Sequence, residues 1–444
     1  MQIQKAKLEK VLDVLGEAIA KKAALPITRH VRLGEGMAAP HNLDRQVVVA
    51  VPELDGDPTV PPYTLFTETV KGFPEGDLVI TPAPGQVYLN MGGQEATVQF
   101  NVMATDYPPL MLGDYHRRTD IDGDFFVRAL EEVAVNAATD ETRPVLNGVL
   151  LEVGEEATLV AADGFRLGVM SLRKRMPLLE EAPAAAVPAD VVPAAEPVTT
   201  RRPRRRSKKG AAAPEPPAPA PAAAPSSQQL VIPLATVEAL CHLWKKLDIN
   251  PAASTSLMKS RRLGIEYRQG FIRFRIPAHW RGQEMLVTLT SLLIQGSFPS
   301  WPGLLPPSRG EGVVFQAQEL ASKVAFLAPI ANEGSGIIRM VWGKDTLMLS
   351  AMGADSGSAG ANVRAATLGS GKVAIAVRYL SSYLRGRTGT VAMECTGPAS
   401  PAKFTHEGRS TVVLMPMFVA WEGEPAPEAP PLEAAPGEEE VEAS

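Results

Sequence analysis

The sequence predicts an α+β fold built from three repeated units of roughly 120 residues each. An apolar, strand-like entry followed by an amphipathic helix occurs three times, starting at Ile3, Gly123 and Val313. In each copy, apolar residues recur at three- and four-residue spacing, as at Leu8 and Leu12 in the first. Such spacing places one apolar stripe on the helix, which has to pack against another element.

A second type of helix also recurs. It follows a Val/Ile-rich strand in the stretches that start at Leu230 and Val373, and a weaker copy starts at Pro61. Between the helices lie short runs of alternating apolar and polar residues, such as NGVLLEV, GFIRFRI, IIRMVWG and TVAMECT, which are typical of strands. Each unit is therefore expected to contain two helices and several antiparallel strands.

The composition divides the chain further. We predict domains over residues 1–117, 118–302 and 303–421, with a disordered insertion at 177–229 and an acidic tail at 422–444. The insertion holds 12 of the 40 prolines and no aromatic residue, so it has little with which to build a core. A basic stretch, residues 201–209, lies in its middle. The tail contains eight glutamates and no basic side chain, as expected of a solvated segment.

Charge and cysteine content exclude several classes of protein. The chain has 44 Lys and Arg against 49 Asp and Glu, and without the insertion and tail its body is almost neutral. A protein that holds nucleic acid by charge alone would be strongly basic. The two cysteines, Cys241 and Cys395, are far apart, which argues against a disulfide scaffold and fits a reducing cytosol. No signal peptide and no apolar run of membrane-spanning length is found.

No catalytic motif is recognisable. The six histidines are scattered, and no phosphate-binding or nucleophile-elbow string stands between a strand and a helix. Asp120, Asp122 and Asp124, with Glu131 beyond them, superficially match a calcium loop, but Phe125 stands where that loop needs its turn glycine. We therefore expect a protein that is not an enzyme, without a metal or other cofactor; an enzyme with an unrecognised site is a further alternative.

Three strings carry a resemblance to a known family. They are TRPVLNGVLLEV at residues 142–153, AADGFRLGV at 161–169 and VVLMPM at 412–417. In this order they resemble the bacterial DNA polymerase III beta subunit family, the sliding clamps. LPIT at Leu25 and IQGSFPSWPGLLP from Ile294 are similar to further family segments. Together with the threefold repeat, the resemblance covers residues 1 to about 420.

This resemblance implies the DNA clamp fold and a head-to-tail homodimer, whose six domains form a ring around duplex DNA with the helices lining the hole. The implied function is processivity in DNA replication: the ring tethers the replicative polymerase and slides. The implied partners are double-stranded DNA without sequence preference, the polymerase catalytic subunit, the clamp loader and other clamp-binding-motif proteins. The expected location is cytoplasmic and nucleoid-associated. An alternative is a clamp-fold peptide-binding scaffold that no longer encircles DNA, because the first unit is the weakest of the three.

The family's hydrophobic groove between the second and third domains binds partner peptides. The resemblance carries this groove to Leu146, Ala162, Gly164, Phe165, Arg166, Leu167, Pro306, Val413, Met415, Pro416 and Met417. Flexible methionines suit a groove that accepts several ligands. The alternative is that VVLMPM is an ordinary buried terminal strand and that Arg166 is a surface arginine. Two positions depart from the family: Ala162 replaces its threonine and Phe165 its histidine, which should enlarge the apolar wall.

The candidate DNA contacts are basic residues near helix ends and one loop, namely Lys21, Lys22, Arg143, Lys245, Lys246, Arg378 and Arg385. Lysines at helix ends also occur simply to complement the helix dipole or to face water. Many clamps have a basic pair after the proline that opens the second-unit helix, whereas this chain has Leu234 and Ala235. The basic stretch of the insertion has no counterpart in the family. It is expected either to contact DNA or an acidic partner, or only to keep the insertion soluble.

Overall fold

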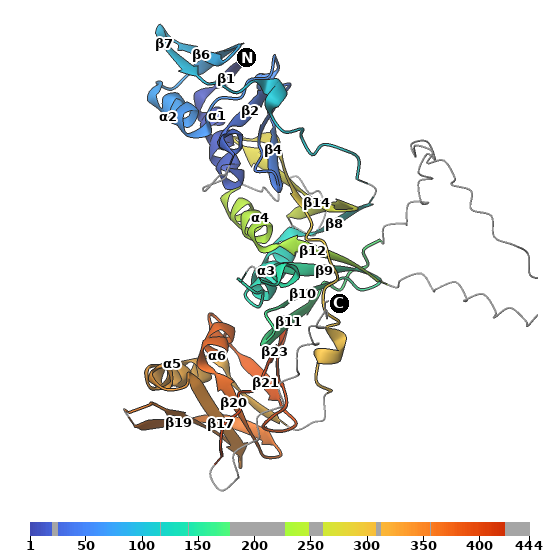
Figure 1. Ribbon diagram of the computed structural model, residues 1–444, viewed down its shortest axis with the longest axis vertical. Helices are drawn as coiled ribbons and strands as arrows, with labels where there is room; N and C mark the ends of the chain where they lie inside the picture. Colours follow the sequence, from blue (N-terminus) through green and yellow to red (C-terminus); the bar gives the residue numbers. More distant parts are fainter. Residues whose placement is uncertain are drawn as a thin grey trace, which may run out of the picture.

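The computed structural model describes residues 1–19, 25–115, 117–140, 142–177, 227–247, 261–307, 312–355 and 357–421. They form a crescent of three lobes (Figure 1). Four helices follow its concave side: α1 (Lys5–Leu15), α4 (Leu234–Lys246), α3 (Gly123–Ala134) and α6 (Val377–Leu384). The strands lie mostly on the convex side of these helices. Helices α2 (Tyr63–Gly72) and α5 (Ala317–Glu333) lie towards its two tips.

Among the described elements, the second and third units share one order of helices and strands, and the first unit has one strand fewer between its two helices. The first unit contains β1 (Gln2–Gln4), β2 (Val31–Gly34), β3 (Met37–Pro40), β4 (Arg45–Ala50), β5 (Asp77–Ala83), β6 (Gln86–Met91) and β7 (Gln94–Gln99). The second contains β8 (Arg117–Asp122), β9 (Gly148–Gly154), β10 (Thr158–Ala162), β11 (Arg166–Ser171), β12 (Ser227–Pro233), β13 (Arg262–Arg268), β14 (Phe271–Trp280) and β15 (Gln283–Leu292). The third contains β16 (Gly312–Gln316), β17 (Ile337–Gly343), β18 (Thr346–Met352), β19 (Ser358–Leu368), β20 (Gly371–Ala376), β21 (Thr390–Glu394), β22 (Ala402–His406) and β23 (Thr411–Leu414).

The predicted helices and α+β class are confirmed, and their apolar stripes explain the packing. In α1, Leu8, Val11 and Leu12 are fully buried, as their spacing predicts. Helix α3 begins where the side chain of Asp122 accepts a hydrogen bond from the backbone N–H of Phe125 at 2.9 Å. This aspartate therefore caps a helix rather than forming part of a calcium loop.

Two of the three antiparallel sheets run across the unit boundaries. The seven-stranded sheet, in the order β2-β3-β4-β15-β14-β13-β8, joins the first and second units through the pair β4 and β15. The twelve-stranded sheet joins the second and third units through β11 and β23. A four-stranded sheet, in the order β1-β5-β6-β7, belongs to the first unit alone. Because ladder hydrogen bonds cross both boundaries, the lobes are held in a defined relative orientation.

The insertion is shorter at its end than predicted. The composition places residues 227–229 in the linker, but they open β12 and pair with β9, with Ser227 opposite Gly154. Strand β12 is the end strand of its sheet, so its first residues are not buried and their polar character does not indicate disorder. Residues 178–226 and the acidic tail, 422–444, lie outside the described residues.

Candidate functional site

The second and third units meet where β11 pairs with β23. Leu167 lies opposite Val413 and Arg166 opposite Leu414. Beyond the end of β23, the backbone N–H of Met415 donates to the carbonyl oxygen of Phe165 at 2.8 Å. Two of the three motifs that carry the resemblance, AADGFRLGV and VVLMPM, therefore contribute neighbouring strands of one sheet.

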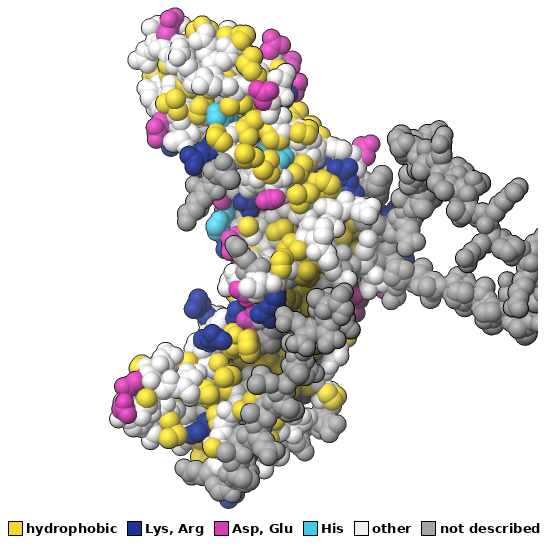
Figure 2. Space-filling view, viewed as in Figure 1, with side chains coloured by type: hydrophobic (Ala, Val, Ile, Leu, Met, Phe, Trp, Pro, Cys, Tyr) yellow, Lys and Arg dark blue, Asp and Glu magenta, His cyan; other side chains and the backbone are white. Residues whose placement is uncertain are grey.

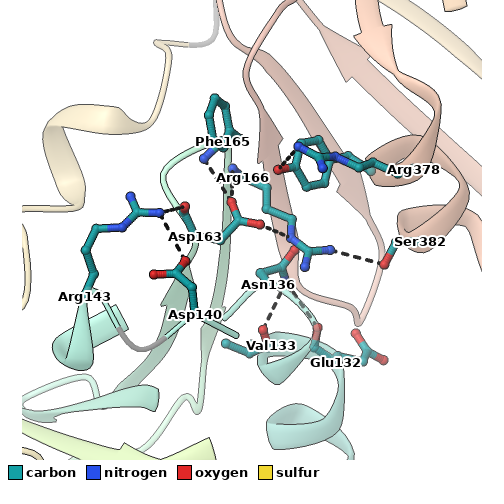
Figure 3. A network of polar contacts seen from close by, with 11 residues as sticks. Glu132, Val133, Asn136, Asp140, Arg143, Asp163, Phe165, Arg166, Arg378 and Ser382 are labelled. Atoms are coloured by element: carbon teal, nitrogen blue, oxygen red, sulfur yellow. Dashed lines mark hydrogen bonds and ion pairs between the residues drawn. The ribbon is translucent and has the colours of Figure 1, made fainter. Parts of the chain in front are cut away.

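The loop before β11 is held by one carboxylate. Asp163 Oδ1 accepts hydrogen bonds from the backbone N–H groups of Phe165 and Arg166, at 2.9 and 3.0 Å. Gly164 has a φ of 93°, in the left-handed region that favours glycine. The side chain of Arg143 donates to the carbonyl oxygen of Asp163 at 3.0 Å and pairs with Asp140 at 3.5 Å (Figure 3). Arg143, predicted to contact DNA, thus supports this loop.

Arg166 connects the loop to the third unit. Its Nε pairs with Asp163 Oδ2 at 2.9 Å, and its Nη1 donates to Ser382 Oγ of α6 at 3.2 Å (Figure 3). Its guanidinium also lies over the Tyr379 ring, 5.2 Å from the centroid. Burial raises the pKa of Tyr379. Arg166 is therefore not merely a solvated surface arginine, because it joins the two units.

Four of the predicted groove residues are buried in a small core at this junction. Leu146, Ala162, Leu167 and Val413 are each less than a tenth exposed, and they pack in one cluster with residues that include Phe298. The position of Val413 agrees with the alternative given for VVLMPM, because this residue is buried in the last strand, β23. These four side chains form the floor beneath the surface rather than the surface itself.

Two predicted residues form an exposed apolar surface above that floor, which we call the junction patch: Phe165, 50% exposed, and Met415, 42% exposed. The Phe165 ring stacks on Tyr379, with centroids 6.2 Å apart and planes 21° apart. The remaining groove candidates, Pro306, Pro416 and Met417, are partly exposed. Met417 packs against the core of the third unit and donates its backbone N–H to Ala374 at 2.8 Å.

The structure also brings Tyr379 and Ser382 to this site, which the sequence reasoning missed. Both lie on α6, whose apolar spacing identifies it as a helix but gives no sign of what it faces. Only the pairing of β11 with β23, which joins residues more than 240 positions apart, places α6 beside the AADGFRLGV motif.

The candidate DNA contacts do not form one group. Lys21 and Lys22 lie outside the described residues. Lys245 forms an ion pair with Glu131 of α3, and Lys246 pairs with Asp13 of α1 at 2.9 Å, so both contribute to contacts between helices. Arg378 and Arg385 of the third unit are exposed, and Arg378 donates to the Tyr379 hydroxyl at 3.0 Å. Figure 2 shows Lys and Arg side chains gathered on the concave side where the middle and lower lobes meet.

In the part of the chain that the structure describes, neither a metal site nor a membrane-spanning helix is found. Within those ranges, no group of three or more His, Cys, Asp or Glu side chains is arranged to hold a metal ion. Among the described helices, none is long and apolar enough to cross a membrane.

Comparisons with known proteins agree with the fold. Residues 120–201 match the family model described as DNA polymerase III beta subunit, central domain. The chain is 27% identical to the beta sliding clamp of Escherichia coli (strain K12) over 42% of this chain and 52% of that protein. It thus spans about half the length of the first curated relatives it matches. It is 23% identical to the Pseudomonas aeruginosa beta sliding clamp over 94% of this chain and 98% of that protein.

Solved structures match over nearly the whole chain. A DNA polymerase sliding clamp from Pseudomonas aeruginosa aligns with a TM-score of 0.72 at 21% identity, covering 94% of this chain and 99% of that one. The DNA polymerase III beta subunit from Thermotoga maritima aligns with a TM-score of 0.69 at 16% identity, with the same coverage. Sliding clamps from Pseudomonas aeruginosa and Bartonella birtlesii were solved bound to griselimycin. These alignments show the sliding clamp fold.

Proposed function

We propose that this chain, a relative of bacterial DNA polymerase III beta subunits with the sliding clamp fold, encircles duplex DNA and tethers a DNA polymerase to it. The observation that carries the proposal is the crescent of three repeated units with helices along its concave side (Figure 1). Two such crescents joined head to tail close a ring of six units. A ring is retained on DNA by topology and not by affinity, which suits a body that is almost neutral.

The alternative of a scaffold without a ring receives less support. It depended on a weak first unit, but that unit contains both helices, α1 and α2, and seven strands. Its core is continuous with that of the second unit, since residues such as Leu12 and Phe126 belong to one buried cluster.

In this proposal the protein has no enzymatic activity and needs no cofactor. It resides in the cytoplasm with the nucleoid, and its partners are DNA, a polymerase, a clamp loader and other proteins with a clamp-binding motif. The basic candidates Lys21, Lys22, Arg143, Lys245, Lys246, Arg378 and Arg385 remain proposed DNA contacts. Arg143 and Lys246 also hold the structure together, so Arg378 and Arg385 are the cleaner residues to substitute.

Partners are proposed to bind at the junction patch. Phe165 and Met415 are exposed, adjacent and supported from below by packed residues, as expected of a site that buries an apolar anchor. The aromatic ring of Phe165 widens the apolar surface where the family has a histidine. Sliding clamps from Pseudomonas aeruginosa and Bartonella birtlesii were solved bound to griselimycin. For this chain, a hydrophobic peptide motif is the ligand class proposed here.

The proposal is tested by primer extension on primed circular DNA with the cognate polymerase and clamp loader. The parent protein should lengthen the extension products. A Met415→Ala, Phe165→Ala double variant should lengthen them less, because it should bind the polymerase at least about fivefold more weakly. Truncating anchor residues typically costs 1 kcal/mol or more of binding free energy.

The control is Met348→Ala. Met348 is 51% exposed on β18, so this variant removes a methionine of similar exposure from a strand that does not form the patch. If the parent fails to lengthen products, the clamp proposal is wrong. If the double variant lengthens the products as much as the Met348→Ala variant does, only the proposed position of the partner site is wrong.

A further inference from the structure

The junction patch lies beside an exposed cation without an acidic partner among the described residues. Phe165 stacks on Tyr379, and the Arg378 guanidinium lies over the same ring, 4.6 Å from its centroid (Figure 3). Arg378 donates to the Tyr379 hydroxyl at 3.0 Å and pairs with no carboxylate of the described ranges. The other arginine at this ring, Arg166, is paired with Asp163. An apolar surface next to an unpaired cation favours a ligand that combines an apolar side chain with negative charge.

The chain that leaves this patch stays on the third unit as far as Trp421. The side chain of Arg339 donates to the carbonyl oxygen of Ala420 at 3.4 Å, and Lys372 Nζ lies 5.1 Å from the centroid of the Trp421 ring. Trp421 is six residues beyond Met415, and a stretch of that length spans at most about 22 Å. The acidic tail therefore begins within that distance of the patch.

The tail, residues 422–444, contains the complementary chemistry. It has eight glutamates and no basic side chain. Apart from its prolines, only Leu432 and Val441 are apolar residues larger than alanine. Leu432 lies between Glu428 and Glu433, so one short segment carries both an apolar anchor and two negative charges.

We propose that the tail binds back to the junction patch of its own chain. Leu432 packs against Phe165 and Met415, and the glutamates beside it lie near Arg378. Leu432 is 11 residues beyond Trp421, and a stretch of that length spans up to about 36 Å. This reach exceeds the largest possible distance from Trp421 back to Met415, so the tail is long enough to place its anchor on the patch.

A tethered ligand competes with free ligands through its effective concentration, which is about millimolar for a short flexible connection. At that concentration even a weak apolar contact is occupied for much of the time. A partner then has to displace the tail before it reaches the patch. This competition rests on the proposed function, because it takes the patch to be the partner site, whereas the binding of the tail requires neither DNA nor a polymerase.

The first measurement detects the bound tail without a partner. The full-length protein is labelled with carbon-13 in its methionine methyl groups, and the NMR signal of Met415 is compared between the parent and Leu432→Ser, the anchor variant. We expect the signal to shift, because this variant releases the patch. Val441→Ser is the matched control and should leave the Met415 signal unchanged. The signal of Met348, exposed on β18, should be the same in all three proteins.

A second set of variants tests the charge. Glu428→Gln combined with Glu433→Gln should move the Met415 signal towards that of the anchor variant. Glu439→Gln combined with Glu440→Gln removes equal charge farther from the anchor and should have less effect. Added salt should also move the parent signal towards that of the anchor variant, since screening weakens contacts between exposed charges.

The second measurement is the affinity of the full-length protein for the cognate polymerase. Leu432→Ser should bind the polymerase about three- to tenfold more tightly than the parent, as expected when a weak ligand at millimolar effective concentration is removed. Val441→Ser should bind it as the parent does.

A Met415 signal that is identical in the parent and in every tail variant would overturn the proposal and leave the tail as a solvated segment. A signal that changes on dilution, at constant oligomeric state, would identify the tail of another copy as the occupant. If the signal shifts without a change in polymerase affinity, the tail binds the patch and the competition is wrong. If no tail variant changes either quantity while the Met415→Ala, Phe165→Ala double variant loses polymerase binding, the proposed function stands and only this inference fails.

Discussion

Gly123, the first residue of α3, lies so close to α4 that there is no room for a Cβ atom at this position. A Cβ added there would lie 2.0 Å from the Trp244 ring of α4, which is itself buried. Alanine is otherwise favoured over glycine in helices. The clash with Trp244 costs more than the helix propensity of alanine gains, so we expect Gly123→Ala to lower the free energy of unfolding by about 1–3 kcal/mol.

Urea denaturation followed by circular dichroism measures this change. Gly72→Ala is the matched control, since Gly72 ends α2 and a Cβ added there would meet no atom within 4 Å. An equal effect in the two variants would show that α3 and α4 do not pack as closely as described.

Asp124 predicts one component of the pH dependence of stability. A hydrogen bond from Arg261, assisted by the Trp244 indole N–H, holds the pKa of this carboxyl below its usual value of 3.8. A depressed folded-state pKa stabilises the protein above the unfolded-state pKa, and this stabilisation is lost as the pH falls through the folded-state value. We therefore expect acidification below about pH 4 to cost the parent more stability than Asp124→Asn.

The measurement compares urea unfolding at neutral pH and in the acid range for the parent, Asp124→Asn and Asp114→Asn. Asp114 is exposed in the connection before β8 and serves as a charge-matched control. The idea is wrong if Asp124→Asn loses as much stability on acidification as the other two proteins. The size of the effect is modest because the side chain is partly exposed.

At the scale of elements, periodicity predicted the helices well and the contacts between units poorly. The stripe of α1 and its copies in α3 and α5 are visible in the sequence because each helix buries one face. The pairing of Leu167 with Val413 is not, since a strand pattern does not identify its neighbour. For the same reason, the sequence did not identify Tyr379 as a residue of the partner site. Arg166 was found only through its motif.

The insertion between β11 and β12 joins two points that are already close together. The backbone N–H of Met176 donates to the carbonyl oxygen of Gly154 at 2.8 Å, and Ser227 pairs with the same residue. A linker of about six Gly and Ser residues in place of 178–226 should therefore close the loop without strain. Since each halving of loop length saves roughly 0.6 kcal/mol of closure entropy, we expect stability to rise by about 1–2 kcal/mol.

The same replacement tests the basic stretch at 201–209. Urea unfolding gives the stability, and the salt dependence of binding to a short duplex reports any contact with DNA. A drop in stability would mean that the insertion supports the fold. Unchanged duplex binding across the salt series would leave the basic stretch as a solubilising segment only.

The whole molecule exposes the features that a ring requires. Strand β7 ends the four-stranded sheet at one tip of the crescent, and β6 is its single strand partner among the described strands. An end strand with free backbone groups is a template for another strand. Strand β19, near the other tip, pairs with β16 through its last residues only, so the edge of its first part is left without a strand partner among the described elements. One crescent can thus offer both ends of a head-to-tail contact, and a heterologous contact that closes after two copies gives a ring.

We therefore expect the purified protein to have a mass of twice 47.3 kDa by sedimentation equilibrium. Negative-stain electron microscopy without imposed symmetry should show closed rings of six similar lobes around an open centre. A charged substitution at an edge, such as Thr97→Arg at an exposed position of β7, should shift the equilibrium towards monomers, whereas Glu284→Gln, at an exposed position of β15 in the second unit, should not. Three-lobed monomers over a wide concentration range, with no rings even when DNA and a loader are present, would contradict topological retention. The junction patch would then remain as a peptide-binding site on a protein that does not encircle DNA.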